Sequence, residues 1–485
     1  MKKIFLSLAV ISSLSVNAFS DEISELRDAI KLLTEKVNDL EKKQSQVQTT
    51  SPDVKVLTNK VNKLEKKQKR TTKTLAKVKK QTSNDNIKWD IDFRTAYNGL
   101  KYGIKNGNDV TNSSVFTNRL WLGMASSPVD GLVFRGQIAA YSTWGGNNLS
   151  KNDPFQNVNW RESSKADDIT FKLRQAYFIY TFNKDSDHAI SISAGRRSAS
   201  DGFLANHREG TKNPGSPLAH ITNMEVDAAM IKVDNLFGLE GSYVKFVAGR
   251  SYDNINQPSY SGTPYTNLNT TDSSVNFFVM PVSVYNDGQY NLMAQYTYID
   301  GFMGANTNEI SALNPAGAIT GAGNKHMGAI SLEINGLNED NDFLDDSIFF
   351  VSTAFTTSVP NSGYTMLGSS KSKTGYSFWT GFIIPDLMTD DGHIGFEYNY
   401  GSKYWAPMTW AEDTLSGSKI ATRGNAYEMY WNLPIINKYF SAQLRYTYMD
   451  YKYKSNIEQF WADPTLENGD ATSAQELRLF LRYTY

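Results

Sequence analysis

The chain has 485 residues, 13% of them aromatic, with 27 Tyr and no Cys. Absence of Cys excludes a disulfide framework and thiolate metal sites. The net charge of −1 hides an asymmetry, because residues 21–86 carry 16 basic and 10 acidic side chains whereas residues 87–485 carry 31 and 40. Two regions of opposite net charge indicate two domains.

The first twenty residues have the pattern of a secretory signal peptide. Lys2 and Lys3 precede an apolar run from Ile4 to Val16, and Ala18-Phe19-Ser20 supplies the small residues of a cleavage site. The apolar run is too short to span a membrane as a helix. We therefore expect residues 1–20 to be a signal peptide that is removed from an exported protein.

Residues 21–86 carry apolar side chains at the 3-4 spacing of a coiled coil, with expected helices at about 22–48 and 54–80. The two runs are an internal repeat, and Pro52 interrupts them. Two arrangements stay open: an oligomeric stalk, such as that of a trimer, or a helical hairpin within one chain. The second helix has 11 Lys/Arg against Glu65 alone, which fits either a solvated face or contact with acidic peptidoglycan.

From residue 87 onward, alternating or aromatic-rich runs of about ten residues recur between turn formers. We expect sixteen strands, with fourteen to eighteen allowed, near 88–97, 115–126, 131–142, 169–182, 188–196, 223–233, 241–252, 274–285, 289–300, 325–335, 347–358, 374–384, 391–401, 425–432, 440–452 and 474–485. Connections after odd-numbered runs are long, beginning with 98–114, whereas those after even-numbered runs are short, such as Ser127–Asp130 and Asn286–Gly288. This rhythm is typical of an outer-membrane β-barrel with short periplasmic turns and longer extracellular loops.

The last strand supports the same architecture. Leu477, Leu479, Leu481, Tyr483 and Tyr485 share one face, because successive side chains of a strand point to opposite sides. We expect this face to contact lipid and the final aromatic residues, Tyr483 and Tyr485, to act as an assembly signal.

Several short motifs accompany this pattern: Phe93-Arg94, Thr117 to Leu122, and Trp144-Gly145. With the signal and the heptads they resemble a porin-like outer-membrane family of the Campylobacter–Arcobacter group, catalogued as a domain of unknown function. The resemblance implies an all-β transmembrane barrel preceded by an α-helical coiled-coil segment. It supplies no agreed substrate and no catalytic residues.

If the apolar face of each strand meets lipid, its polar face lines the lumen. The basic side chains expected there form one wall: Arg94, Arg119, Arg135, Lys172, Arg174, Arg445, Arg478 and Arg482. The acidic side chains expected elsewhere in the lumen are Glu225, Asp227, Glu333, Glu397 and Glu428. Such charges either create a transverse field that selects solutes or pair with each other structurally.

The third long connection, 197–222, is a candidate for an inward-folded constriction loop, and an outward surface loop is the alternative. Its polar residues include Asp201, His207, Arg208, Glu209 and Lys212.

The five histidines, at positions 188, 207, 220, 326 and 393, show no helical zinc spacing, and no nucleophile-elbow motif is present. We expect no catalytic residues, cofactor, metal site or nucleic-acid partner. The sequence thus predicts an outer-membrane channel for small hydrophilic solutes or ions. A structural or adhesive anchor whose coil contacts the cell wall is the alternative, and an outer-membrane hydrolase is the third possibility.

Overall fold

The computed structural model describes Lys36 and residues 87–485, except 145–170, 185, 187, 199–201, 212–213, 236–237, 240, 253–274, 307–318, 339, 390, 410–411, 413 and 455–461. The predicted signal peptide lies outside the described residues, as does the predicted coiled coil apart from Lys36, which is helical and exposed. The unit that contains the strands runs from Ser83 to Tyr485.

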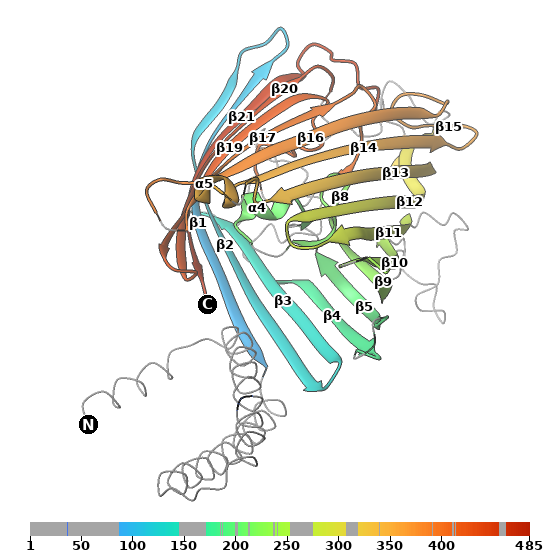
Figure 1. Ribbon diagram of the computed structural model, residues 1–485. Helices are drawn as coiled ribbons and strands as arrows, with labels where there is room; N and C mark the ends of the chain where they lie inside the picture. The colour runs from blue at the N-terminus through green and yellow to red at the C-terminus, as the bar shows by residue number, and fades with distance from the viewer. Residues whose placement is uncertain are drawn as a thin grey trace, which may run out of the picture. The chain divides into compact units, whose positions relative to one another are not determined.

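Within the described residues, sixteen long antiparallel strands form one closed barrel (Figure 1). Their bounds are β1 Lys88–Ile104, β2 Val110–Val129, β3 Leu132–Thr143, β4 Lys172–Phe182, β5 Ile190–Ser198, β9 Glu225–Asp234, β10 Tyr243–Tyr252, β11 Val275–Asn286, β12 Tyr290–Asn306, β13 Ile319–Asn335, β14 Ile348–Pro360, β16 Lys373–Pro385, β17 His393–Gly401, β19 Gly424–Ile436, β20 Phe440–Tyr451 and β21 Ala471–Thr484. Each pairs with the next along the chain, and β21 pairs with β1. The predicted barrel of sixteen strands is confirmed.

Short elements occupy several of the connections. They are β6 Gly202–Phe203, α4 Ala205–Glu209, β7 Gly215–Leu218, β8 Thr222–Asn223, α5 Asp342–Asp345, β15 Tyr364–Thr365 and β18 Met408–Thr409. None of the helices in the described part of the chain has the length and apolar character needed to cross a membrane.

The barrel closes where its first and last strands meet. Phe93 lies opposite Tyr483 and Arg94 opposite Arg482. Ile91 and Tyr485 exchange both backbone hydrogen bonds, at 3.0 and 2.9 Å. The chain's final residue therefore takes part in closure, which removes the sheet edge that an open sheet would expose.

Alternation along the strands sorts side chains into an exposed apolar face and a buried face. On β21, Leu477, Leu479 and Leu481 are each more than 40% exposed, whereas Glu476 and Arg478 are fully buried. On β1, Trp89 and Phe93 are exposed and Asp92 is buried. The alternation of exposed and buried side chains expected for the first and last strands is present at these positions, and their contact with lipid or lumen stays a prediction.

The connections follow the predicted rhythm with two exceptions. The connection 336–347, expected to be short, contains α5 and is as long as the connections 307–318 and 361–372. The long connection expected at 98–114 is wrong, because β1 continues to Ile104 and β2 begins at Val110. Leu100 and Val115 are buried in a cluster with Tyr141 and Leu415, and this packing keeps the two strands paired beyond the expected turn. The tight turn between β2 and β3 lies at Asp130-Gly131, where the φ of +80° at Gly131 suits glycine.

The apolar core lies inside the barrel. Phe203, Leu218 and Ile221 from the connection between β5 and β9 pack in one cluster with Trp405 and Ile420 from the connection between β17 and β19. Wall residues on the inner face complete this cluster: Met327, Phe350, Trp379 and Tyr430. The lumen is thus partly filled by two inserted connections.

A charge placed on the exposed face tests whether that face contacts lipid. Leu479 lies near the middle of β21 and is 48% exposed. We expect Leu479→Arg to lower the free energy of unfolding in lipid vesicles by about 2–4 kcal/mol, the cost of Arg at a bilayer midplane. This free energy is measured by urea titration, in which the folded-barrel band on an unboiled gel reports the fraction of folded protein.

Leu387→Arg is the matched control, because Leu387 is 90% exposed in the turn between β16 and β17. That variant should unfold at the wild-type urea concentration. Equal effects of the two substitutions would contradict lipid contact at Leu479.

Candidate functional site: a charged, partly filled barrel lumen

The connection between β5 and β9 crosses the interior of the barrel. Figure 1 shows α4 and β8 within the ring of wall strands. The ring nitrogen Nε2 of His207 lies 2.7 Å from Oε2 of Glu333 on β13. Leu218 donates its backbone N–H to Oε1 of Gln295 on β12 at 2.8 Å. Contacts to two wall strands show that this segment is folded inward.

Three side chains of the opposite wall hold the carbonyl groups of α4. Asn432 on β19 donates to the carbonyl of His207 at 3.1 Å. Gln443 on β20 donates to the carbonyl of Arg208 at 2.6 Å. Arg482 on β21 donates to the carbonyl of Glu209 at 2.9 Å. A five-residue helix leaves most of its carbonyls without helical partners, and wall side chains donate to the last three of α4. The carbonyl of His207 also accepts from the backbone N–H of Gly210 at 3.1 Å.

His220 anchors the same connection to β14 and β16. Its Nδ1 lies 2.6 Å from Oγ of Ser352, and its Nε2 lies 2.8 Å from Oγ of Ser377. Trp379 and Trp405 meet its ring edge to face. Burial lowers the pKa of His220 to about 3, so that the imidazole is neutral near pH 7.

The connection between β17 and β19 is the second inserted segment. Its β18 pairs in parallel with β8, Met408 opposite Thr222, so the two inserted connections support each other. Trp405 is fully buried and donates through Nε1 to the carbonyl of Ile420 at 2.7 Å. Ser416 donates through Oγ to Oε2 of Glu476 on β21 at 2.8 Å. This segment therefore reaches across to the strand that closes the barrel.

The inserted segments bring cations to the predicted acidic residues. Nζ of Lys419 donates to Oε2 of Glu397 at 2.6 Å and also to Glu428. The Arg208 guanidinium lies 3.6 Å from Glu412 and 3.9 Å from Glu428. Both cations are less than 5% exposed, and buried charges of this kind require partners.

The predicted basic residues also have close partners. Asp92 on β1 accepts from Arg119 on β2 at 2.7 Å and from Arg482 on β21 at 2.8 Å. The guanidinium groups of Arg119 and Arg174 lie over the Trp121 ring, at 3.5 and 3.9 Å from its centre.

The remaining basic residues also make ion pairs, hydrogen bonds or cation–π contacts. Arg174 is 3.2 Å from Glu225, Arg478 donates to Asn98 at 2.6 Å, Arg445 lies 4.0 Å from Glu428, and Arg94 lies over the Phe480 ring at 5.1 Å. Pairing among lumen charges is therefore extensive in the described part of the chain.

The remaining candidates lie elsewhere or outside the described residues. Asp227 is on the exposed face with a side chain 65% exposed, beside Arg196, so the prediction that it lines the lumen is wrong. Its neighbours Val226 and Ala228 occupy the more buried positions, because the two-residue period does not continue unbroken from Glu225.

Among the other predicted residues, Arg135 and Lys172 are exposed. Asp201 and Lys212 lie outside the described residues, and the assembly role of Tyr483 and Tyr485 stays a prediction.

Sequence reasoning missed the second inserted connection and its Glu412 and Lys419. One signal could have found it: residues 402–423 contain Trp405, Met408 and Ile420, apolar side chains that a solvated loop seldom carries together. The role of Asp92 as a partner of two arginines was also missed, because it depends on strands at opposite ends of the chain.

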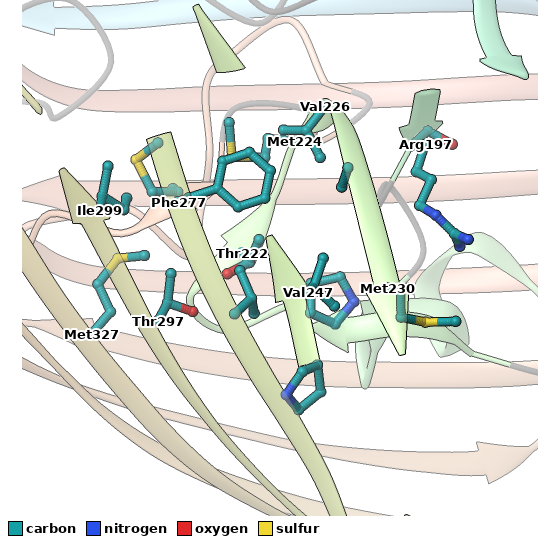
Figure 2. Close-up of a pocket in the computed structure, with 16 residues that line it drawn as sticks. Arg197, Thr222, Met224, Val226, Met230, Val247, Phe277, Thr297, Ile299 and Met327 are labelled. Atoms are coloured by element: carbon teal, nitrogen blue, oxygen red, sulfur yellow. The ribbon is translucent and has the colours of Figure 1, made fainter. Parts of the chain in front are cut away.

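A mostly apolar pocket lies between the first inserted connection and the inner face of β9–β13 (Figure 2). Its cavity volume is about 70 Å³. The side chains that line it are Arg197, Ser198, Pro217, Thr222, Met224, Val226, Ala228, Met230, Val247, Phe277, Val279, Pro281, Thr297, Ile299, Met327 and Met408. Figure 2 shows Arg197 at one edge of this group, to the right of Val226 and Met224.

A family described as "Protein of unknown function (DUF3373)" matches residues 109–479. The chain belongs to this family. No curated protein matches the sequence.

Among solved structures, this chain is similar in fold to OprB of Pseudomonas putida, with 12% identity, 82% of this chain and 94% of that chain covered, and a TM-score of 0.46. The chain is also similar to an anion-selective porin from Comamonas acidovorans, with 11% identity, 82% of this chain and 99% of that chain covered, and a TM-score of 0.46. For OmpF of Salmonella typhi, in complex with Daunomycin, the identity is 8%, the coverage is 82% of this chain and 98% of that chain, and the TM-score is 0.42.

We expect low pH to reduce the stability of the folded protein through the buried His220. Above pH 6.5 the imidazole is neutral in both folded and unfolded chains, so it contributes no pH dependence. As pH falls from 6.5 toward 3, the unfolded chain binds a proton that the buried ring does not, and the folded state loses stability. We expect the urea midpoint of the wild type to fall more steeply between pH 6.5 and 4 than that of His220→Gln.

His188→Gln serves as the control, because His188 is exposed in the connection between β4 and β5. It should keep the wild-type pH dependence. Parallel curves for wild type and His220→Gln would show that His220 does not titrate with unfolding.

Proposed function

We propose that this protein is an outer-membrane channel for small hydrophilic solutes or ions. The observation that carries the proposal is a closed barrel with an exposed apolar face and an interior that holds most of the described arginines and their acidic partners. An exposed apolar belt around a charged interior suits a lipid exterior and a polar path inside. Transport would be passive, since neither charge pairing nor the fold requires a cofactor.

The connection 197–222 is proposed as the constriction. Support comes from the contacts of α4 with wall strands on both sides: Glu333 on β13 and Arg482 on β21. A segment held at both ends narrows the lumen to the space beside it. The long connections are proposed to face the cell exterior, with residues 1–20 as signal peptide and 21–86 as a periplasmic coil.

The structural anchor remains the second candidate, and one observation favours it. The inner face of β16–β21 is closely covered, with Trp379, Tyr430, Arg445 and Arg478 at 2% exposure or less. A barrel filled in this way could hold a cell-wall-binding coil without conducting. Single-channel recording in planar bilayers separates the two, because an anchor would remain silent.

Removal of the constriction should enlarge the current. We expect wild-type protein to give small, ohmic openings, and a variant with residues 205–211 replaced by a short Gly-Ser linker to give severalfold larger ones. The same recording measures both. A linker replacement at 361–363, which is exposed between β14 and β16, is the control and should conduct as wild type. Unchanged conductance without α4 would contradict the constriction.

Reversal of an exposed lumen charge should change ion selectivity. Arg135 lies opposite Tyr177 near the short-turn end of β3 and is exposed, unlike the paired Arg119 and Arg174. We expect Arg135→Glu to shift the reversal potential toward cation preference in a salt gradient while the barrel still folds. Lys371→Glu, in an exposed connection, should shift it less. If the two variants shift the reversal potential equally, Arg135 does not line the proposed path.

A further inference from the structure

We propose that the apolar pocket between the first inserted connection and β9–β13 binds a small amphipathic monoanion, an apolar ring or short chain that carries one carboxylate. This site rests on the proposed function only in that its ligand would be a solute of the channel. The cavity volume is about 70 Å³, several times the ~10–15 Å³ that a single water needs.

The chemistry of the lining favours an apolar body. Met224, Met230, Met327 and Met408 contribute flexible thioether side chains, and the Phe277 ring adds an aromatic surface. Methionine-rich surfaces adapt to ligands of varied shape. The two threonines, at positions 222 and 297, and Ser198 are the neutral polar groups of the lining.

Arg197 supplies the charge. Its Nε and Nη2 are buried, and neither has a hydrogen-bond partner within the described part of the chain. The guanidinium centre lies 4.1 Å from the centre of the Tyr177 ring, and no ion pair joins it to a described carboxylate. Buried donors without acceptors are costly, so a ligand carboxylate would supply what this group lacks.

Nearby charges have the same sign. Lys232 and Lys245 are cross-strand partners on β9 and β10, two residues along the same faces from the pocket residues Met230 and Val247. They lie close enough to each other and to Arg197 for mutual repulsion. Asp234 pairs with Lys232 at 2.5 Å, which leaves an excess of positive charge beside the pocket. A ligand with a single negative charge suits this surface better than a neutral or cationic one.

Strand alternation provides a matched pair of variants. Ala228 lines the pocket and is 7% exposed, whereas Ala229 is exposed on the opposite face of β9. Ala228→Leu places three more carbon atoms in the pocket. Ala229→Leu adds the same atoms outside it.

Isothermal titration of the detergent-solubilised full chain with 2-naphthoate tests the proposal. We expect saturable binding that is abolished by Ala228→Leu, kept by Ala229→Leu, and weakened roughly tenfold or more by Arg197→Met. The uncharged 2-naphthol should also bind roughly tenfold or more weakly. An unboiled gel confirms that each variant is folded.

Three results would overturn the inference: no saturable binding to the wild type, equal binding of naphthoate and naphthol, or equal binding to the Ala228→Leu and Ala229→Leu variants. The last would indicate partition into detergent. Because titration does not depend on conduction, a barrel that binds but stays silent contradicts the channel alone. One that conducts without binding contradicts this site alone.

Discussion

The pairing of β1 with β21 is the constraint on which the rest of the structure depends. Once the ring closes, every second residue of each strand must face the same enclosed space, and no strand edge remains to relieve a poor match. Like charges then meet across the seam, as Arg94 and Arg482 do. Asp92 offsets this repulsion, because its carboxylate accepts hydrogen bonds from Arg482 on β21 and from Arg119 on β2. Closure of the barrel therefore requires that the charges it brings together be paired.

The two inserted connections separate like charges on β17 and β19, a few strands from the seam. Glu397 and Glu428 face each other as register partners on β17 and β19, and two adjacent carboxylates destabilise one another. Lys419 from the second connection lies between them, and Arg208 from the first approaches Glu428. The connections thus add cations beside these two carboxylates, where the wall itself places Arg445 at 4.0 Å from Glu428. Their apolar residues fill the remaining space.

This arrangement has a functional consequence for the proposed channel. Charges that are fully paired contribute little field to a passing solute, so selectivity would depend on the few lumen groups that stay exposed or unpaired, such as Arg135 and Arg197. The space that the first connection leaves against β9–β13 is apolar rather than charged. The lumen therefore combines a paired polar side with an apolar pocket beside a cationic group.

The sequence by itself determined the strands and their sidedness. A two-residue period is local, so the alternation of Leu477, Leu479 and Leu481 with Glu476 and Arg478 is legible without knowledge of any partner. The same logic located all sixteen strands and the rhythm of their connections. It failed where packing overrides local turn signals, as at 98–114, where Leu100 and Val115 extend the hairpin, and where the period breaks, as at Asp227.

Only the tertiary structure decided which charges pair and which connections enter the lumen. His207 reaches Glu333 across 126 residues of sequence, and Arg482 reaches Asp92 across 390. Such partners are fixed by the order and shear of the strands around the ring, which no local pattern encodes. The pocket at Arg197 likewise exists only because a folded-in segment faces a distant part of the wall.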